Sequence, residues 1–159
     1  MRPDINGRIA ERASRSQLGL ITHPQLDEIG VTEKQRRAMV CSGRWRSLGR
    51  TVLADNAAPR TVEQSCLAAV LDLGRPAGVT QSTAAWLVGL REWWPEPIHV
   101  LTKRGGNHRP VHGRLHETFW LPPTHLQVVR NVPCVSNARL VFELRRSSPS
   151  NAWNGSPTG

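Results

Sequence analysis

The sequence has few cysteines, no long hydrophobic run and fewer acidic than basic residues. Its three cysteines, Cys41, Cys66 and Cys134, lie far apart and form no Cys-x-x-Cys pair, which argues against a disulfide framework and against a zinc ribbon. No segment approaches the ~18 consecutive apolar residues of a membrane span, and the N-terminus lacks the apolar core of a signal peptide. We therefore expect a soluble protein of the reducing cytoplasm, without a membrane partner.

Motifs of catalysis are missing as well. There is no Ser, Cys or Thr in a glycine-framed nucleophile elbow, no phosphate-binding Walker loop, and no set of carboxylates and lysine suited to metal-dependent hydrolysis. The loop 103–110 is basic and contains glycines, but it lacks the Gly-Lys-Ser/Thr ending and a following helix. We expect no enzymatic activity, no catalytic residue and no cofactor.

Three histidines spaced four apart, His108, His112 and His116, have the spacing of metal ligands on a helix. Pro110 and Gly113 argue against such a helix. On a strand, His112 and His116 would share a face as part of a polar edge, with Glu117 pointing the other way. We therefore predict no metal site.

Basic residues exceed acidic ones, and the excess is densest in the first third of the chain. The 159 residues include 21 Lys and Arg against 12 Asp and Glu, giving a formal net charge of +9 and a pI near 11.3. Residues 1–60 contain 11 of the basic residues, whereas the much longer remainder contains 10. This balance favours a polyanionic partner such as nucleic acid, although general enrichment in arginine would give the same totals.

Residues 1–56 have the pattern of a winged helix-turn-helix. Apolar periodicity and end signals predict three helices, over residues 4–17, 22–29 and 33–41. Thr22 and Thr32 are placed as N-caps of the second and third helices, and Gly30 ends the second. Two short helices joined in this way are a candidate helix-turn-helix.

A β-hairpin is predicted after the third helix, with strands 44–48 and 51–54 around the turn Gly49–Arg50. In this class of motif the last helix enters the major groove of DNA and the wing follows the phosphates. The candidate residues for binding double-stranded DNA are Lys34, Gln35, Arg37, Arg44, Arg46 and Arg50. The alternative is a solvated basic face. We expect Trp45 to anchor the wing to the core.

Residues 61–146 predict a small mixed α/β module after a linker at 55–60, so the fold class is α+β. Helices are expected over 61–73, 82–88 and 136–146, and strands over 98–102, 111–118 and 126–130. Three tryptophans are expected to pack in this module: Trp86, Trp93 and Trp94. Residues 147–159 are rich in Ser, Pro, Asn and Gly and predict a disordered tail.

Several segments occur in an order that resembles one family: GLITHPQL at 19–26, SGRWRSL at 42–48, QSTAAWLVGL at 81–90 and VPCVSNAR at 132–139. Their order resembles that of AbiEi-type antitoxins and of related actinobacterial proteins that continue into a nuclease-like domain. The resemblance implies an antitoxin-like DNA-binding repressor of a type IV toxin–antitoxin system. It also implies a nucleotidyltransferase-like toxin as partner.

The chain departs from this family at three places. Arg36 stands where an aliphatic residue is expected to pack inward, and residues 51–54 replace the glycine and aromatic residue of the second wing strand. The relatives continue beyond Arg146, so we expect a truncated chain without nuclease activity. Two alternatives therefore stay open: residues 61–146 bind a toxin or a second copy, or the chain is a nonfunctional remnant.

Overall fold

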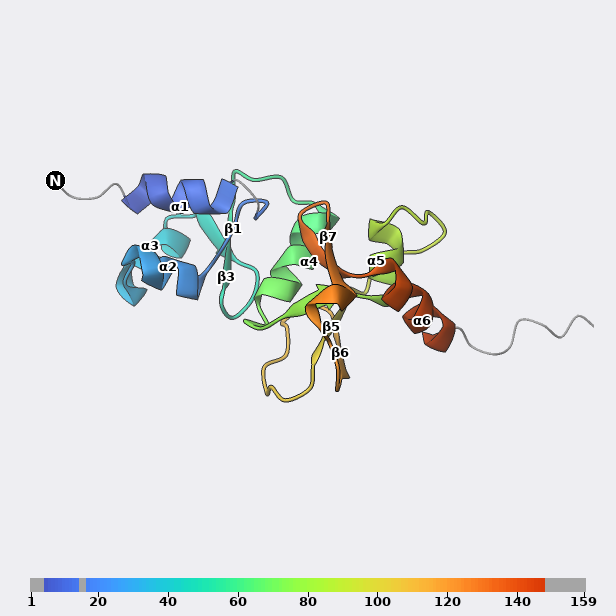
Figure 1. The fold of residues 1–159 in the computed structure, drawn as a ribbon. Helices are drawn as coiled ribbons and strands as arrows, with labels where there is room; N and C mark the ends of the chain where they lie inside the picture. Colours follow the sequence, from blue (N-terminus) through green and yellow to red (C-terminus); the bar gives the residue numbers. More distant parts are fainter. Residues whose placement is uncertain (1–4, 15–16, 148–159) are drawn as a thin grey trace, which may run out of the picture.

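A computed structural model of the chain describes residues 5–14 and 17–147 and shows a mixed α+β fold with two β-sheets (Figure 1). The predicted tail at 147–159 lies outside the described residues, apart from Ser147, which ends the last helix. Within the described ranges, no helix has the length and apolar character needed to cross a membrane.

The N-terminal part alternates helices with short strands. Its elements are α1 (Ile5–Ser14), β1 (Leu20–Thr22), α2 (His23–Ile29), α3 (Glu33–Cys41), β2 (Trp45–Ser47) and β3 (Val52–Asp55). This confirms the three predicted helices and the hairpin. The sequence analysis missed β1, which pairs antiparallel with β3 and gives a sheet of order β1-β3-β2.

Threonine caps fix both short helices. The hydroxyl of Thr22 accepts a hydrogen bond from the backbone of Gln25, whose side chain accepts one from the Thr22 backbone. Thr32 and Gln35 make the same reciprocal pair at the start of α3. Gly30, with a φ of +88°, ends α2 in the left-handed conformation that glycine adopts without strain. The two caps and this glycine define a tight turn between the helices.

A small core holds the three helices against the first sheet. It consists of Ile9, Ala13, Ile21, Leu26, Val31, Trp45 and Leu53. Trp45 is only 4% exposed, which confirms that it anchors the hairpin.

The rest of the described chain forms a five-stranded mixed sheet with helices. The elements are α4 (Val62–Leu71), β4 (Ala77–Val79), α5 (Gln81–Leu87), β5 (His99–Lys103), β6 (Arg114–Thr118), the 3-10 turn η1 (Pro123–His125), β7 (Leu126–Val129), β8 (Val132–Val135) and α6 (Asn137–Ser147). The strand order is β6-β5-β4-β8-β7. The pairs β4/β8 and β5/β6 are parallel, and the other neighbours are antiparallel.

The sequence analysis missed β4 and β8, although they lie at the centre of this sheet. β4 has three residues and contains Gly78, and β8 contains Pro133, so neither has the length or composition of a typical strand. A side chain at position 78 would lie 2.8 Å from Leu126 and 3.2 Å from the backbone of Cys134. Gly78 therefore permits the close packing at the sheet centre.

Two predictions in this part need correction. Trp94 does not pack in the core: it is 75% exposed, because Pro95 and Ile98 are the buried residues of its loop. Trp86 and Trp93 are half-buried. The strand predicted over 111–118 begins only at Arg114, because Gly113 has a φ of +104° and interrupts extended backbone.

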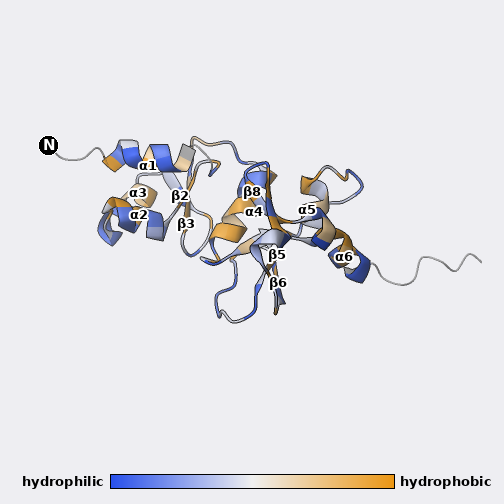
Figure 2. Ribbon diagram, in the orientation of Figure 1, coloured by the Kyte–Doolittle hydropathy of each residue, from blue (hydrophilic) through white to orange (hydrophobic). Residues whose placement is uncertain are grey.

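Helix α4 connects the two sheets. Its buried residues occupy most of its circumference, and much of the helix is hydrophobic (Figure 2). It packs on β1 of the first sheet and on β4 and β8 of the second. The main hydrophobic core accordingly includes Leu20, Val52 and Ala54 of the first sheet together with residues of the second. The apolar interior is thus continuous across the linker at 55–60.

Asp72, at the C-terminal end of α4, adds a polar contact at the same junction. Its side chain is 1% exposed and accepts hydrogen bonds from the backbone N of Thr51 at 3.0 Å and of Val111 at 3.3 Å. Thr51 lies beside the hairpin turn, and Val111 lies in the loop before β6. One buried carboxylate therefore connects the wing with the second sheet.

We predict that Asp72→Ala destabilises the whole chain. The substitution leaves two backbone N–H groups without their acceptor, and a loss of this kind costs about 2 to 4 kcal/mol. Chemical denaturation followed by tryptophan fluorescence measures the change. The control is Glu28→Ala, whose carboxylate is 63% exposed and forms a surface ion pair with Arg12; an equal loss in both variants would contradict the role given to Asp72.

Candidate nucleic-acid interface

Helix α3 is the most exposed helix of the N-terminal part. It contains no buried residue, and Met39 is its one apolar side chain that packs against the small core. A 9-residue helix held at one side by a single apolar contact presents most of its surface to solvent. The hairpin β2–β3 follows directly, and a groove between the two is lined by Arg37, Cys41 and Ser47 among others.

Three predicted site residues lie on α3. Lys34 and Arg37 are exposed, three residues apart, and so project from one side of the helix. Arg37 forms an ion pair with Glu33 in which both side chains are more than 60% exposed, and such a pair contributes little stability. Gln35 is also exposed, but its side chain is used in the capping pair with Thr32. Lys34 and Arg37 are therefore the α3 side chains that a ligand can reach without disturbing the helix.

Arg36 turns the other way. Its side chain is 17% exposed and forms an ion pair with Asp27 of α2. The position thus faces α2, and the arginine satisfies its charge on the neighbouring helix, whereas the sequence analysis expected an aliphatic residue there. This explains how α3 is seated despite the departure from the pattern.

The wing carries the other three predicted residues, and they differ in their surroundings. Arg44 is exposed, and no side-chain partner of it is found in the described ranges. Arg50 is exposed at the hairpin turn, and its Nη1 lies 3.2 Å from Nδ1 of His108. Both side chains remain accessible to an anion.

Arg46 is held within the protein. Its Nη1 donates to the carbonyl of Asp55 at 3.2 Å and to the side chain of Asn56 at 3.1 Å, and its Nη2 donates to Oε1 of Gln64 at 2.7 Å. Gln64 is 2% exposed and donates in turn to the carbonyl of Leu18. The guanidinium therefore fixes the hairpin to α4, and sequence reasoning missed Gln64 because its partners lie far away along the chain.

Lys34, Arg37 and Arg44 are exposed basic residues on α3 and on the segment that leads into the hairpin. Glu33 is the one acidic residue between positions 33 and 50. Such a surface attracts phosphate. An arginine on a helix that fits the major groove of DNA can make bidentate contacts with guanine. We name these three residues the basic face.

The described ranges contain no group of three His, Cys, Asp or Glu residues placed to hold a metal ion. His108 lies 3.7 Å from Asp72, a neighbour that the sequence analysis did not foresee. The buried thiols of Cys66 and Cys134 have a pKa raised to about 12 by burial, so they stay protonated and unreactive at neutral pH.

His116 instead pairs with His99 on the neighbouring strand. Nδ1 of His99 lies 2.8 Å from Nε2 of His116, and the rings are stacked. Burial, then the proximity of His116 and Arg114, lowers the pKa of His99; burial is also the main cause that lowers the pKa of His116. In the neutral pair, one ring donates an N–H to the bare ring nitrogen of the other.

Comparison with known proteins leaves the family open: no family model matches this chain, and no curated protein matches it. The resemblance to AbiEi-type antitoxins therefore remains a prediction.

We predict that Arg46→Lys lowers thermal stability although it keeps the charge. Lysine cannot reproduce a planar fork that serves three acceptors, and the loss is about 1 kcal/mol for a partly solvated group. Differential scanning calorimetry measures the midpoint temperature of thermal unfolding. Arg44→Lys is the matched control and should leave the midpoint unchanged; a similar drop in both variants would show that the contacts of Arg46 do not matter.

We also predict that the histidine pair makes stability depend on pH. Since the folded pKa values lie below that of an unfolded histidine, the unfolded chain binds more protons as pH falls through about 6.5. Stability contributed by the pair is thus present above that pH and decreases below it. Between pH 7.5 and 5, the free energy of unfolding measured by urea denaturation should decrease less for His116→Gln than for the wild type. The exposed His112→Gln is the control and should keep the wild-type slope.

Proposed function

We propose that residues 5–56 act as a winged helix-turn-helix that binds double-stranded DNA. The observation that carries the proposal is α3: it is capped, it buries no residue, and it carries exposed basic side chains next to a β-hairpin. A helix that serves only the core would bury an apolar stripe. The helix order and the sheet order β1-β3-β2 agree with this motif.

Five of the candidate residues take three roles in this proposal: contact with bases, contact with phosphates and positioning of the hairpin. Arg37 and Lys34 lie on the helix that enters the major groove, so they are assigned to base edges and the adjoining phosphates. Arg44 and Arg50 lie at the two ends of the wing and are assigned to phosphates. Arg46 is assigned a positioning role, because its hydrogen bonds set the hairpin against α4.

The narrower role follows from the sequence resemblance. We propose an antitoxin-like repressor, partnered with a nucleotidyltransferase-like toxin, that controls transcription by occupying an operator through α3. The resemblance and the basic face support this role together, and neither requires a catalytic residue.

We predict that Arg37→Ala reduces affinity for a selected duplex more than for a scrambled one. Loss of a bidentate guanine contact costs ~1 to 3 kcal/mol on the preferred sequence. Arg44→Ala should weaken binding to both duplexes equally. The wild-type slope of log K against log salt is expected to lie between roughly −3 and −4, and this variant should make it less negative by about one unit. Fluorescence anisotropy over several salt concentrations measures both.

Two controls complete the experiment. Arg91→Ala removes an exposed arginine from the loop after α5, at the opposite end of the molecule from α3 (Figure 1), and should change nothing. Glu33→Gln removes the acidic neighbour of Arg37 and should strengthen binding. Failure of the wild type to bind any duplex at low salt would refute the proposal.

A further inference from the structure

A second surface of the protein gathers aromatic and basic side chains, far from the basic face. It consists of Arg104, Phe119, Trp120, Arg139, Phe142 and Arg146, which we call the aromatic–arginine surface. Phe119 is 77% exposed, Trp120 65% and Phe142 54%. The chain has only two phenylalanines, and both lie here rather than in the core.

The rings on this surface are held in place from one side. The guanidinium carbon of Arg104 lies 5.0 Å from the ring centre of Phe119. Arg139 and Arg146 lie 5.9 Å and 5.8 Å from the ring centre of Phe142. Each arginine contacts its ring at cation–π distance, yet both phenylalanines stay more than half exposed to solvent.

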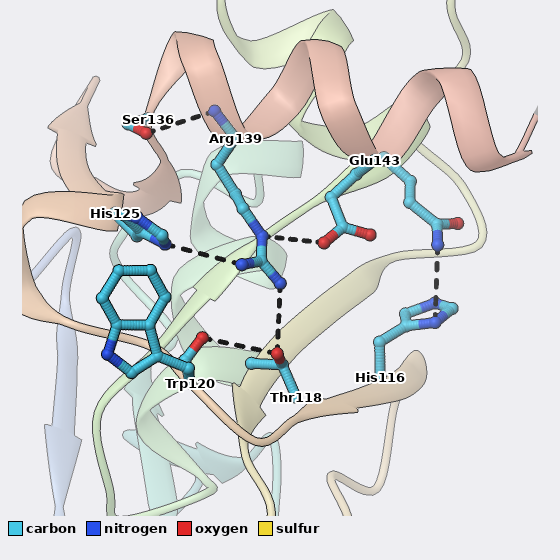
Figure 3. A network of polar contacts seen from close by, with 8 residues as sticks. His116, Thr118, Trp120, His125, Ser136, Arg139 and Glu143 are labelled. Carbon is cyan, nitrogen blue, oxygen red and sulfur yellow. Dashed lines mark hydrogen bonds and ion pairs between the residues drawn. The ribbon is translucent and has the colours of Figure 1, made fainter.

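Trp120 is supported by a polar network (Figure 3). Its ring meets His125 edge to face at 4.7 Å, and the Thr118 hydroxyl donates to its carbonyl at 3.3 Å. Arg139 of α6 connects Thr118 with its own helix. Its Nη2 donates to the Thr118 hydroxyl at 3.2 Å, and its Nε donates to Glu143 at 2.8 Å. These contacts fix the position of Trp120 before any ligand binds.

The local charge is positive. Glu143 pairs with Arg139, and Glu117 lies 3.7 Å from Arg75, so the two acidic residues of this region already face cations. Arg145 and Arg146 continue the positive charge along the last turn of α6, and Lys103 adds to it at the end of β5. Among the described residues, no acidic partner is found for Arg104, Arg145 or Arg146. Exposed rings beside such cations complement a ligand that has flat apolar faces and a negative backbone.

We propose that the aromatic–arginine surface binds single-stranded nucleic acid. Unpaired bases stack on Phe119 and Trp120, and the phosphates follow Arg104 and the basic end of α6. A base inside a duplex has no free face for such stacking, so this surface selects single strands, whereas the basic face is proposed for duplex DNA. The two proposals rest on different residues and fail independently.

The test is anisotropy of a labelled 20-nucleotide oligothymidylate, which forms no duplex, with the full chain at low salt. We expect binding that the double variant Phe119→Leu/Trp120→Leu weakens by about tenfold, because leucine keeps the apolar character but removes the stacking ring. Trp94→Leu changes a tryptophan outside this surface that is even more exposed than Trp120, and this variant should bind as the wild type does. Lys34→Ala/Arg37→Ala should also keep its affinity for the single strand, even where duplex binding is lost.

Other outcomes overturn the proposal. The first is a wild-type chain that is folded but does not bind oligothymidylate. The second is a loss of affinity in the Trp94 control equal to that of the Phe119/Trp120 double variant. The third is a loss of the same size in the Lys34/Arg37 variant. If the surface is instead a contact between protein chains, sedimentation shows an oligomer that Phe119→Lys dissociates, with no oligothymidylate binding. Unchanged thermal midpoints of the leucine variants verify that the altered affinity is not a folding defect.

Discussion

The buried carboxylate of Asp72 is the polar contact on which the relation between the two sheets depends. It lies at the end of α4, which packs on both sheets, and it accepts backbone hydrogen bonds from Thr51 and Val111. Gly49 passes so close to it that an added Cβ would lie 2.5 Å from the carboxylate. The wing turn is thereby fixed to α4, and Arg46 fixes the other end of the hairpin to the same helix through Gln64.

These two attachments leave α3 free to face solvent. The small core needs Met39 alone from this helix, and the ion pair of Arg36 with Asp27 supplies its second attachment. A helix whose stability comes from its caps and one side can carry Lys34 and Arg37 outward at little cost to the fold. The exposed basic face is thus a consequence of how α2 and the hairpin are secured.

Local signals in the sequence were sufficient for part of this structure. Thr22 and Thr32 cap helices through neighbours three residues away, so the ends of α2 and α3 could be predicted. Two strands depend on partners from other parts of the chain: β1, and β8 with its Pro133. No local sequence pattern indicates either of them. The same holds for the site: exposure of Lys34 follows from helical periodicity, whereas the contacts of Arg46 with Gln64 and of Thr118 with Arg139 of α6 depend on tertiary structure.

The shared core of the two sheets has an energetic consequence for any ligand of this chain. Because Leu20 and Val52 pack in the same apolar cluster as the second sheet, the two halves are expected to unfold in one cooperative transition. By mass action, a molecule bound at either end raises the unfolding free energy of the entire chain. A duplex held by α3 would then slow the exchange of amide hydrogens in β5 and β8, at residues that the DNA never touches.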